Sequence, residues 1–263
     1  MDDKRNIILA MVLTGLILFG WPYIADRLFP GAQQADQQVE QQRSADGVVT
    51  PGAPQAPAAP AAPRARAAVL KDSPRIAIET PKLHGSIALK GARIDDVILP
   101  TYQETQQKDS PPIQLFSPSG TKDAYFAGFG WSGDGLKAPN ADTLWQASGD
   151  KLTPTSPVTL SWDNGAGQTF EIALSIDENY MITAQQKVTN ASAGTIGVRP
   201  YGFISRAEKS TDLDTWTIHV GPMGVFNGAA NYDVNYDDVD DGSAPGMLTS
   251  TGGWLGFTDK YWL

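Results

Sequence analysis

The strongest hydrophobic pattern in the chain is an uninterrupted apolar run near its start, residues 7–24, with the sequence IILAMVLTGLILFGWPYI. A helix rises about 1.5 Å per residue, so this run would extend roughly 27 Å, close to the ~30 Å hydrocarbon core of a bilayer. Trp21 and Tyr23 lie at its far end, where amphipathic rings favour the boundary between lipid and water. The pattern predicts a transmembrane helix over residues 7–25, with both rings at a membrane interface.

The charges that flank this run predict its orientation. Lys4 and Arg5 precede it, and Arg27 is the first basic residue after it. The positive-inside rule then predicts that residues 1–6 are cytoplasmic and that the rest of the chain lies on the other side of the membrane. A cleavable signal peptide would need a shorter apolar region followed by small residues. The bulky sequence WPYIADRLFP stands there instead, so a retained anchor is favoured.

Residues 26–73 change abruptly to a Gln-, Ala- and Pro-rich composition, with stretches such as QQADQQVEQQ and PGAPQAPAAPAAPRARAA. Large apolar side chains are too few to offset the entropy of ordering this segment. Its Pro/Ala part would form an extended spacer of about 3.1 Å per residue. We therefore expect a disordered linker that holds a folded domain away from the membrane. A proline-rich recognition site is the alternative, but no P-x-x-P with flanking specificity residues stands out.

Over residues 74–250 the pattern changes to short alternating runs bounded by Pro, Gly, Ser and Asp, such as RIAIET, IQLFS and TLWQAS. The clearest is VTLSWDNGAGQTFEIALSID at 158–177, where two alternating runs flank a turn at Asn164-Gly165. No helical period with caps stands out between residues 75 and 250. The prediction is a mainly β protein built on a large β-sandwich.

The printed sequence ends on GGWLGFTDKYWL, which is apolar and aromatic where chain termini are normally polar. At about 100° per residue, five side chains fall within an arc of about 160° on a helix. These residues are Trp254, Leu255, Phe257, Tyr261 and Trp262. The spacing predicts a short amphipathic helix over residues 251–263 that lies in the bilayer interface. The alternative is a last helix or strand packed on the sandwich.

Composition narrows the classes of function. The 263 residues carry a formal net charge of −9, which argues against nucleic acid as a partner because nucleic-acid binders show a basic face. The absence of cysteine excludes disulfides, thiolate metal sites and cysteine nucleophiles.

Two motifs resemble binding sites without their required context. Residues 128–133 read G-x-G-x-x-G, but the following DGLKAPN breaks helices, so we expect a glycine-rich loop between strands and no dinucleotide site. Asp233, Asn235 and Asp237 have the spacing of a calcium loop, yet Asp238 and Ala244 stand where that motif needs Gly and Glu. A looser calcium site and a solvated acidic loop remain as the two interpretations of this segment.

No constellation of residues predicts catalysis. His84 and His219 are the only two histidines, and neither has an adjacent nucleophile or acid. Several carboxylates could meet in space as a glycosidase pair. They are Asp95, Asp96, Glu171, Asp177 and Glu178. All have the sequence context of ordinary strand-edge and turn charges, so the prediction is a protein that is not an enzyme, without catalytic residues, cofactor or metal.

Three segments, in order, resemble the YidC family of bacterial membrane protein insertases. The start matches M-D-x-x-R-N through Met1, Asp2, Arg5 and Asn6. The sandwich opening IAIETPKLHGSIALKGARIDDVILPTY repeats the family's order of a strand, a Gly near a basic residue, an acidic pair and Leu-Pro-x-Tyr. The GGW of residues 252–254, with the aromatic residues that follow, resembles the family's entry into its membrane core.

The resemblance implies a protein that inserts and folds inner-membrane proteins, alone or with the Sec translocon and its accessory subunits, and without a cofactor. It implies a periplasmic domain with a galactose-mutarotase-like supersandwich, a location in the bacterial inner membrane, and the lipid bilayer and nascent membrane proteins as partners. The groove of the membrane core would belong to helices that follow residue 263, so we expect this chain to be an anchor and docking portion. The alternative is a membrane-anchored periplasmic sandwich that binds or processes carbohydrate. Which sandwich face meets a partner, and whether its groove holds a peptide or a sugar, stays open.

Overall fold

The computed structural model describes residues 62–209, 219–244, 246 and 248–259. The predicted transmembrane helix at 7–25 and most of the predicted linker lie outside this part of the chain. Within it, no helix is both long enough and apolar enough to cross a membrane.

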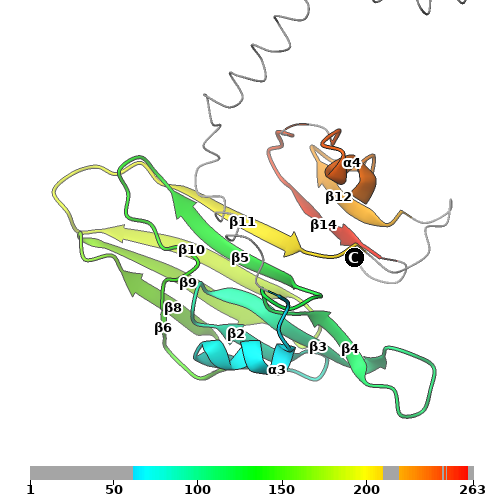
Figure 1. The fold of residues 1–263 in the computed structure, drawn as a ribbon. Helices are drawn as coiled ribbons and strands as arrows, with labels where there is room; N and C mark the ends of the chain where they lie inside the picture. Colours follow the sequence, from blue (N-terminus) through cyan, green and yellow to red (C-terminus); the bar gives the residue numbers. More distant parts are fainter. Residues whose placement is uncertain (1–61, 210–218, 245, 247, 260–263) are drawn as a thin grey trace, which may run out of the picture. The chain divides into compact units, whose positions relative to one another are not determined.

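The larger sheet has seven strands, which follow one another in space as β11-β5-β3-β2-β1-β7, with β4 paired to β3 beside this path (Figure 1). Its strands are β1 (Arg75–Glu79), β2 (His84–Ala88), β3 (Arg93–Gln103), β4 (Pro112–Phe116), β5 (Tyr125–Ser132), β7 (Lys151–Leu152) and β11 (Arg199–Arg206). All neighbours are antiparallel except β1 and β7, which run parallel.

A second, four-stranded sheet has the order β10-β9-β8-β6. Its strands are β6 (Gln146–Ala147), β8 (Val158–Asp163), β9 (Gln168–Ile176) and β10 (Ile182–Asn190). The predicted hairpin is confirmed as β8–β9. Asn164 is buried in the turn, where its Oδ1 accepts from the amide of Gln168 at 3.1 Å, and Gly165 takes the positive φ of 71° that the turn requires.

The alternating apolar residues of the two sheets form one buried cluster. Ile76 and Ile78 come from β1, whereas Phe170, Ile172 and Leu174 come from β9. Because successive side chains on a strand point to opposite faces, this alternation puts one face of each sheet into a shared core. The predicted mainly β sandwich is confirmed.

A third sheet has the order β13-β12-β14, made of β12 (Gly221–Phe226), β13 (Ala229–Asn231) and β14 (Gly253–Thr258). The segment between β13 and β14 contains the short helix α4 (Tyr236–Asp240). Asn235 caps α4 by accepting from the amides of Asp237 and Asp238, while the side chain of Asp238 accepts from the amide of Asn235. The sequence prediction of no helix between 75 and 250 therefore missed α4.

The amphipathic helix predicted for residues 251–263 is wrong over 253–258, because these residues form strand β14. Gly253 pairs with Phe226 and Thr258 with Gly221 along the whole of β12. Gly252, Gly253 and Gly256 each lower helix propensity by about 1 kcal/mol relative to Ala. Pairing with β12 satisfies the backbone instead, and the helical arc of the aromatic residues did not outweigh these glycines.

Two further expectations need correction. The predicted linker extends to residue 73, but its last residues form the helix α3 (Arg66–Val69) and the 3₁₀ turn η1 (Leu70–Asp72). The charged contacts of Arg66, described below, hold this helix to the domain, and composition alone does not reveal such contacts. The expected glycine-rich loop at 128–133 lies mostly within β5. Positions 128 and 130 require glycine because the rings of Phe203 and Tyr201 occupy the space that a Cβ would take.

Candidate functional site

An apolar cavity of about 570 Å³ lies between the large sheet and the three-stranded sheet. Its walls are Ala127, Phe129, Gly202, Phe203 and Ile204 from β5 and β11, and Val225, Phe226, Leu248, Ser250, Gly252, Gly253, Trp254 and Leu255 from β12, β14 and the loop before β14. Ligand sites are commonly clefts of about 300–1,000 Å³ lined by apolar and aromatic side chains. By size and lining, this cavity is the strongest candidate site in the described part of the chain.

An ion pair and a group of aromatic rings join the two sheets beside the cavity. Arg206 at the end of β11 donates to both carboxylate oxygens of Asp259, at 3.1 and 2.9 Å, and both side chains are largely shielded from solvent. The Arg206 guanidinium lies 5.1 Å from the ring centroid of Tyr125 and 5.9 Å from that of Tyr236. Phe257 packs edge-on against Tyr125 and parallel to Tyr236.

Burial raises the pKa of both tyrosine hydroxyls in this joint, and the nearby Arg206 charge partly opposes that rise. Tyr125 and Tyr236 are therefore neutral at physiological pH. The joint combines cation–π contacts with an ion pair in which one guanidinium nitrogen, Nη1 of Arg206, donates to both carboxylate oxygens of Asp259, and so it fixes the end of β14 against β5 and β11.

The residues predicted to contact a membrane interface have different surroundings. Trp254 and Leu255 are 44% and 59% exposed at the rim of the cavity. Phe257 is only partly exposed, because it packs in the aromatic joint. Two sets of predicted residues lie outside the described part of the chain. They are Lys4, Arg5, Trp21 and Tyr23 near the start, and Tyr261 and Trp262 near the end.

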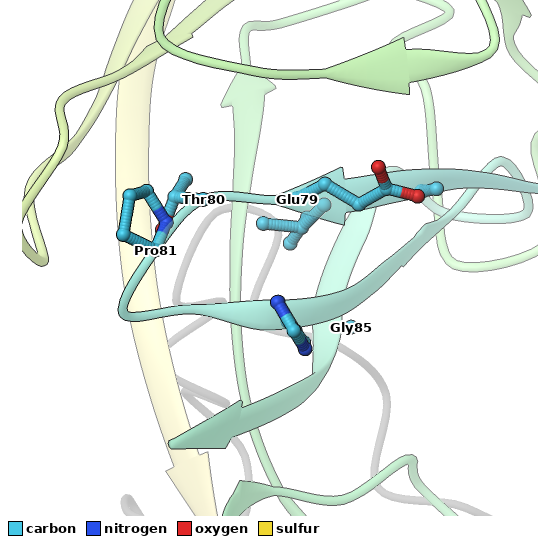
Figure 2. Close-up of a pocket in the computed structure, with 7 residues that line it drawn as sticks. Glu79, Thr80, Pro81 and Gly85 are labelled. Carbon is cyan, nitrogen blue, oxygen red and sulfur yellow. The ribbon is translucent and has the colours of Figure 1, made fainter. Parts of the chain in front are cut away.

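A second hollow, of about 560 Å³, lies at the β1–β2 turn, where Glu79, Thr80, Pro81 and Gly85 line it (Figure 2). His84 is paired with Glu79 in the β1–β2 register, so these two residues are candidates for an acid–base pair of the kind a carbohydrate enzyme uses. Lys151 holds the Glu79 carboxylate at 2.8 Å, however, and Thr80 accepts from the amide of Leu83 to close the turn. These contacts join Glu79 to β7 and close the β1–β2 turn.

The candidate carboxylates on the sandwich also have structural partners. Asp95 and Asp96 are buried on β3, where Arg75 donates to Asp95, and both Arg66 and Ser86 donate to Asp96. Burial raises the pKa of Asp95, although the hydrogen bond and charge of Arg75 oppose it. Each of the two aspartates is therefore paired with its own arginine.

The remaining acidic candidates are engaged at the surface. Glu171 pairs with Lys187 at 2.7 Å, and Asp177 accepts from the amides of Asn179 and Met181 in a turn. Glu178 is exposed in that same turn.

The acidic segment that resembled a calcium loop serves the α4 cap and binds Lys209. Asn235 is the N-cap, and Lys209 pairs with Asp237 and Asp240, each at 2.7 Å. No three acidic or histidine side chains within the described ranges are grouped to hold a metal ion. His219 contacts the carbonyl of Pro222 through Nε2, at 2.9 Å.

Sequence reasoning missed the Arg206–Asp259 joint and the cavity beside it. One signal was available: residues 248–258, LTSTGGWLGFT, contain neither a charge nor a proline. Such a stretch is typical of an extended apolar segment that meets other polypeptide.

Comparison with known proteins identifies the family. Residues 75–263 match the family model described as the YidC periplasmic domain. Proteins named "Membrane protein insertase YidC" from Zymomonas mobilis and Bradyrhizobium diazoefficiens are 40% and 41% identical over the whole of this chain, which covers 45% and 46% of their lengths. Another, from Acidiphilium cryptum, is 44% identical over 75% of the chain. The chain thus spans less than half the length of the relatives it matches. From these matches and the β-sandwich that underlies them, we conclude that the chain belongs to the YidC family and that residues 75–263 are a YidC periplasmic domain.

Proposed function

We propose that this chain is the anchor and periplasmic portion of an insertase that places membrane proteins in the bacterial inner membrane. The observation that carries the proposal is the order of the parts: a periplasmic domain of the YidC family follows an 18-residue uncharged apolar run and a Pro/Ala-rich linker. Relatives that match the whole chain are named for that insertase activity.

In this proposal the domain acts by presenting surfaces to other proteins. Its buried carboxylates are neutralised by arginines, and the apolar cavity between its sheets carries no ionisable side chain in its lining. The Sec translocon and its accessory subunits are the proposed partners of that periplasmic surface. Nascent membrane proteins and the bilayer are the proposed partners of the whole protein.

The orientation within this proposal rests on charge. Lys4 and Arg5 would keep the N-terminus in the cytoplasm, and Trp21 and Tyr23 would lie at the periplasmic interface. Protease protection tests this directly. In inverted inner-membrane vesicles the sandwich is expected to be shielded, and it becomes digestible once detergent opens the vesicles. Digestion without detergent would place the domain in the cytoplasm and contradict the proposal.

The docking role has its own test. A photo-reactive amino acid at Leu144, which is 57% exposed, or at Met181, which is 65% exposed, would be irradiated with purified translocon in proteoliposomes. Leu144 lies in the loop before β6 and Met181 in the turn between β9 and β10, so a cross-link at one alone also identifies the part of the surface that docks. No cross-link at either, nor at further exposed positions around the sandwich, would refute docking.

A further inference from the structure

The first part of the folded domain, residues 64–72, rests on the sandwich through few contacts. We call this segment, which contains α3 and η1, the strap. Its helix α3 has no buried residue, and Ala65 at its N-cap offers the helix no side-chain hydrogen bond. A helix of four residues is far below the roughly 12–15 residues at which an isolated helix becomes marginally stable in water. The strap is therefore ordered by its contacts with the sandwich and not by its own sequence.

Those contacts lie on one face of the strap, which meets β3 of the large sheet (Figure 1). Arg66, Val69 and Leu70 are the partly buried residues of the strap, and their i, i+3, i+4 spacing puts them side by side on a helix. Arg66 donates to Asp96, yet its Nε atom is buried without a hydrogen-bond partner in the described part of the chain. This unpaired donor weakens docking, because water pairs with it when the strap is free.

The sandwich keeps partners for its buried aspartates when the strap leaves. Asp96 retains the hydrogen bond from Ser86, and Asp95 retains its ion pair with Arg75. Arg93 adds a further positive charge near Asp95, which favours the ionised form of that carboxyl. Because each aspartate keeps a partner within the sheet, the surface that binds the strap can persist without it.

The chain is fastened to the sheet again immediately after the strap. The carbonyl of Pro74 accepts from the amide of Leu89 at 2.9 Å, and the side chain of Ser73 accepts from the amide of Lys90 at 3.0 Å. Both donors follow β2 directly, so these bonds tie the residues before β1 to the large sheet. Undocking of the strap can therefore stop at Ser73 and leave the sandwich folded.

We propose that the strap docks on and off the folded sandwich as one unit, hinged at Ser73 and Pro74, so that the domain has a short and a long connection to its linker. Undocking adds about ten residues to the linker and lengthens its reach by roughly 30 Å. The short form keeps the sandwich near the start of the linker, and the long form lets it meet more distant partners. The effect on reach rests on the proposed membrane anchor, whereas the docking equilibrium belongs to the domain and is measured independently of its orientation in a membrane.

Amide hydrogen exchange in the full chain, held in detergent micelles, measures the undocking. Ala68 and Val69 both donate their amides to the carbonyl of Ala65 within the strap. These two amides are expected to be protected about 10- to 100-fold, with little change in low urea, because undocking exposes little surface. The amides of β9 are expected to be protected at least about 1,000-fold more and to lose that protection steeply in urea.

Two results of this experiment would overturn the proposal. If the strap amides share the protection and the urea dependence of β9, the strap leaves only when the whole sandwich unfolds. If the strap amides have no protection at all, the strap does not dock in solution.

Distances between spin labels measure the two forms directly, because the chain has no cysteine of its own. Labels at Ala67→Cys and Lys122→Cys, both exposed positions, would relate the strap to the loop in which the Gly120 carbonyl accepts from the amide of Arg64. The distance distribution is expected to contain a major, narrow population from the docked form and a minor, broad population at longer distances.

Two variants separate docking from a general effect of charge. Arg66→Met removes the contact with Asp96 and is expected to increase the broad population at least about fivefold. Arg64→Met removes an ion pair that lies within the strap, to Asp72, and keeps the backbone bond to the loop, so the distribution should not change. Circular dichroism verifies that both variants are folded. An unchanged distribution in Arg66→Met, or equal shifts in the two variants, would overturn the proposal.

Discussion

The contacts of Arg66 fix the point at which the folded domain begins, and Arg66→Met tests them. Arg66 on α3 donates to Asp96, which also accepts from Ser86, and Ser86 in turn accepts from Arg75. Arg75 completes the network by donating to Asp95. The two arginines and two aspartates of this network balance in charge. Through Arg66, the network holds α3, which the sequence pattern assigned to the linker.

The magnitude follows from the burial of the pair. Removing one partner of a fully buried ion pair costs about 3–5 kcal/mol, because the other charge is left without compensation. The Arg66 side chain is 23% exposed and that of Asp96 is 10%, and Asp96 keeps its bond from Ser86. We therefore expect Arg66→Met to lower the free energy of unfolding by about 2 kcal/mol. For a domain of this size that corresponds to a fall in Tm of roughly 4–8 °C.

Arg64→Met is the matched control. Arg64 flanks the same helix and pairs with Asp72, but both side chains are half exposed. The substitution removes the same charge, and exposed pairs contribute little, so no measurable change in Tm is expected. Calorimetry would be combined with amide exchange of α3, which should accelerate in Arg66→Met alone. Equal Tm values for the two variants would refute the reasoning that burial makes the Arg66–Asp96 pair important.

Three other substitutions have defined outcomes. Gly130→Ala places a Cβ 2.5 Å from the ring of Tyr201, so a loss of about 1–3 kcal/mol is expected in chemical denaturation, and Gly130→Ala combined with Tyr201→Leu should recover much of it. Burial raises the pKa of Asp95 in the folded state, so protonation of this carboxyl favours the native state. As the pH falls from 7 towards 4, the wild-type protein should therefore gain stability relative to the Asp95→Asn variant. A difference in urea midpoints that stays constant with pH would contradict this. Arg206→Met removes the ion pair to Asp259 and should accelerate amide exchange in β12 and β14 while that of β9 stays unchanged; acceleration across all three strands would show that the joint is not local.

Local patterns predicted the sandwich well because its strands alternate along short stretches. The β8–β9 hairpin could be predicted from the alternation of apolar and polar residues on both sides of Asn164-Gly165, because a β-hairpin is formed by residues that are close in sequence. The buried faces of β1 and β9 followed from the same alternation.

Features that depend on distant residues could not be predicted this way. β14 is a strand because β12, about thirty residues earlier, offers it a partner, and the helical arc of its aromatic residues carried no information about that partner. The cavity likewise needs β5 and β11 on one wall and β12 and β14 on the other. Arg66 and Asp96 are 30 positions apart, so their ion pair has no local signature in an Ala/Arg-rich stretch.

The position of α3 changes the expected reach of the linker. With a linker of residues 26–73, the predicted Pro/Ala spacer would extend to the first strand at about 3.1 Å per residue. The structure instead holds residues 66–72 as α3 and η1, and Arg64 donates its amide to the carbonyl of Gly120. About ten residues are thereby removed from the spacer, which shortens its maximum reach by roughly 30 Å. Because the Arg66–Asp96 pair maintains this docking, its loss is expected to destabilise the domain and to return these residues to the predicted spacer, so the Arg66→Met variant tests both effects together.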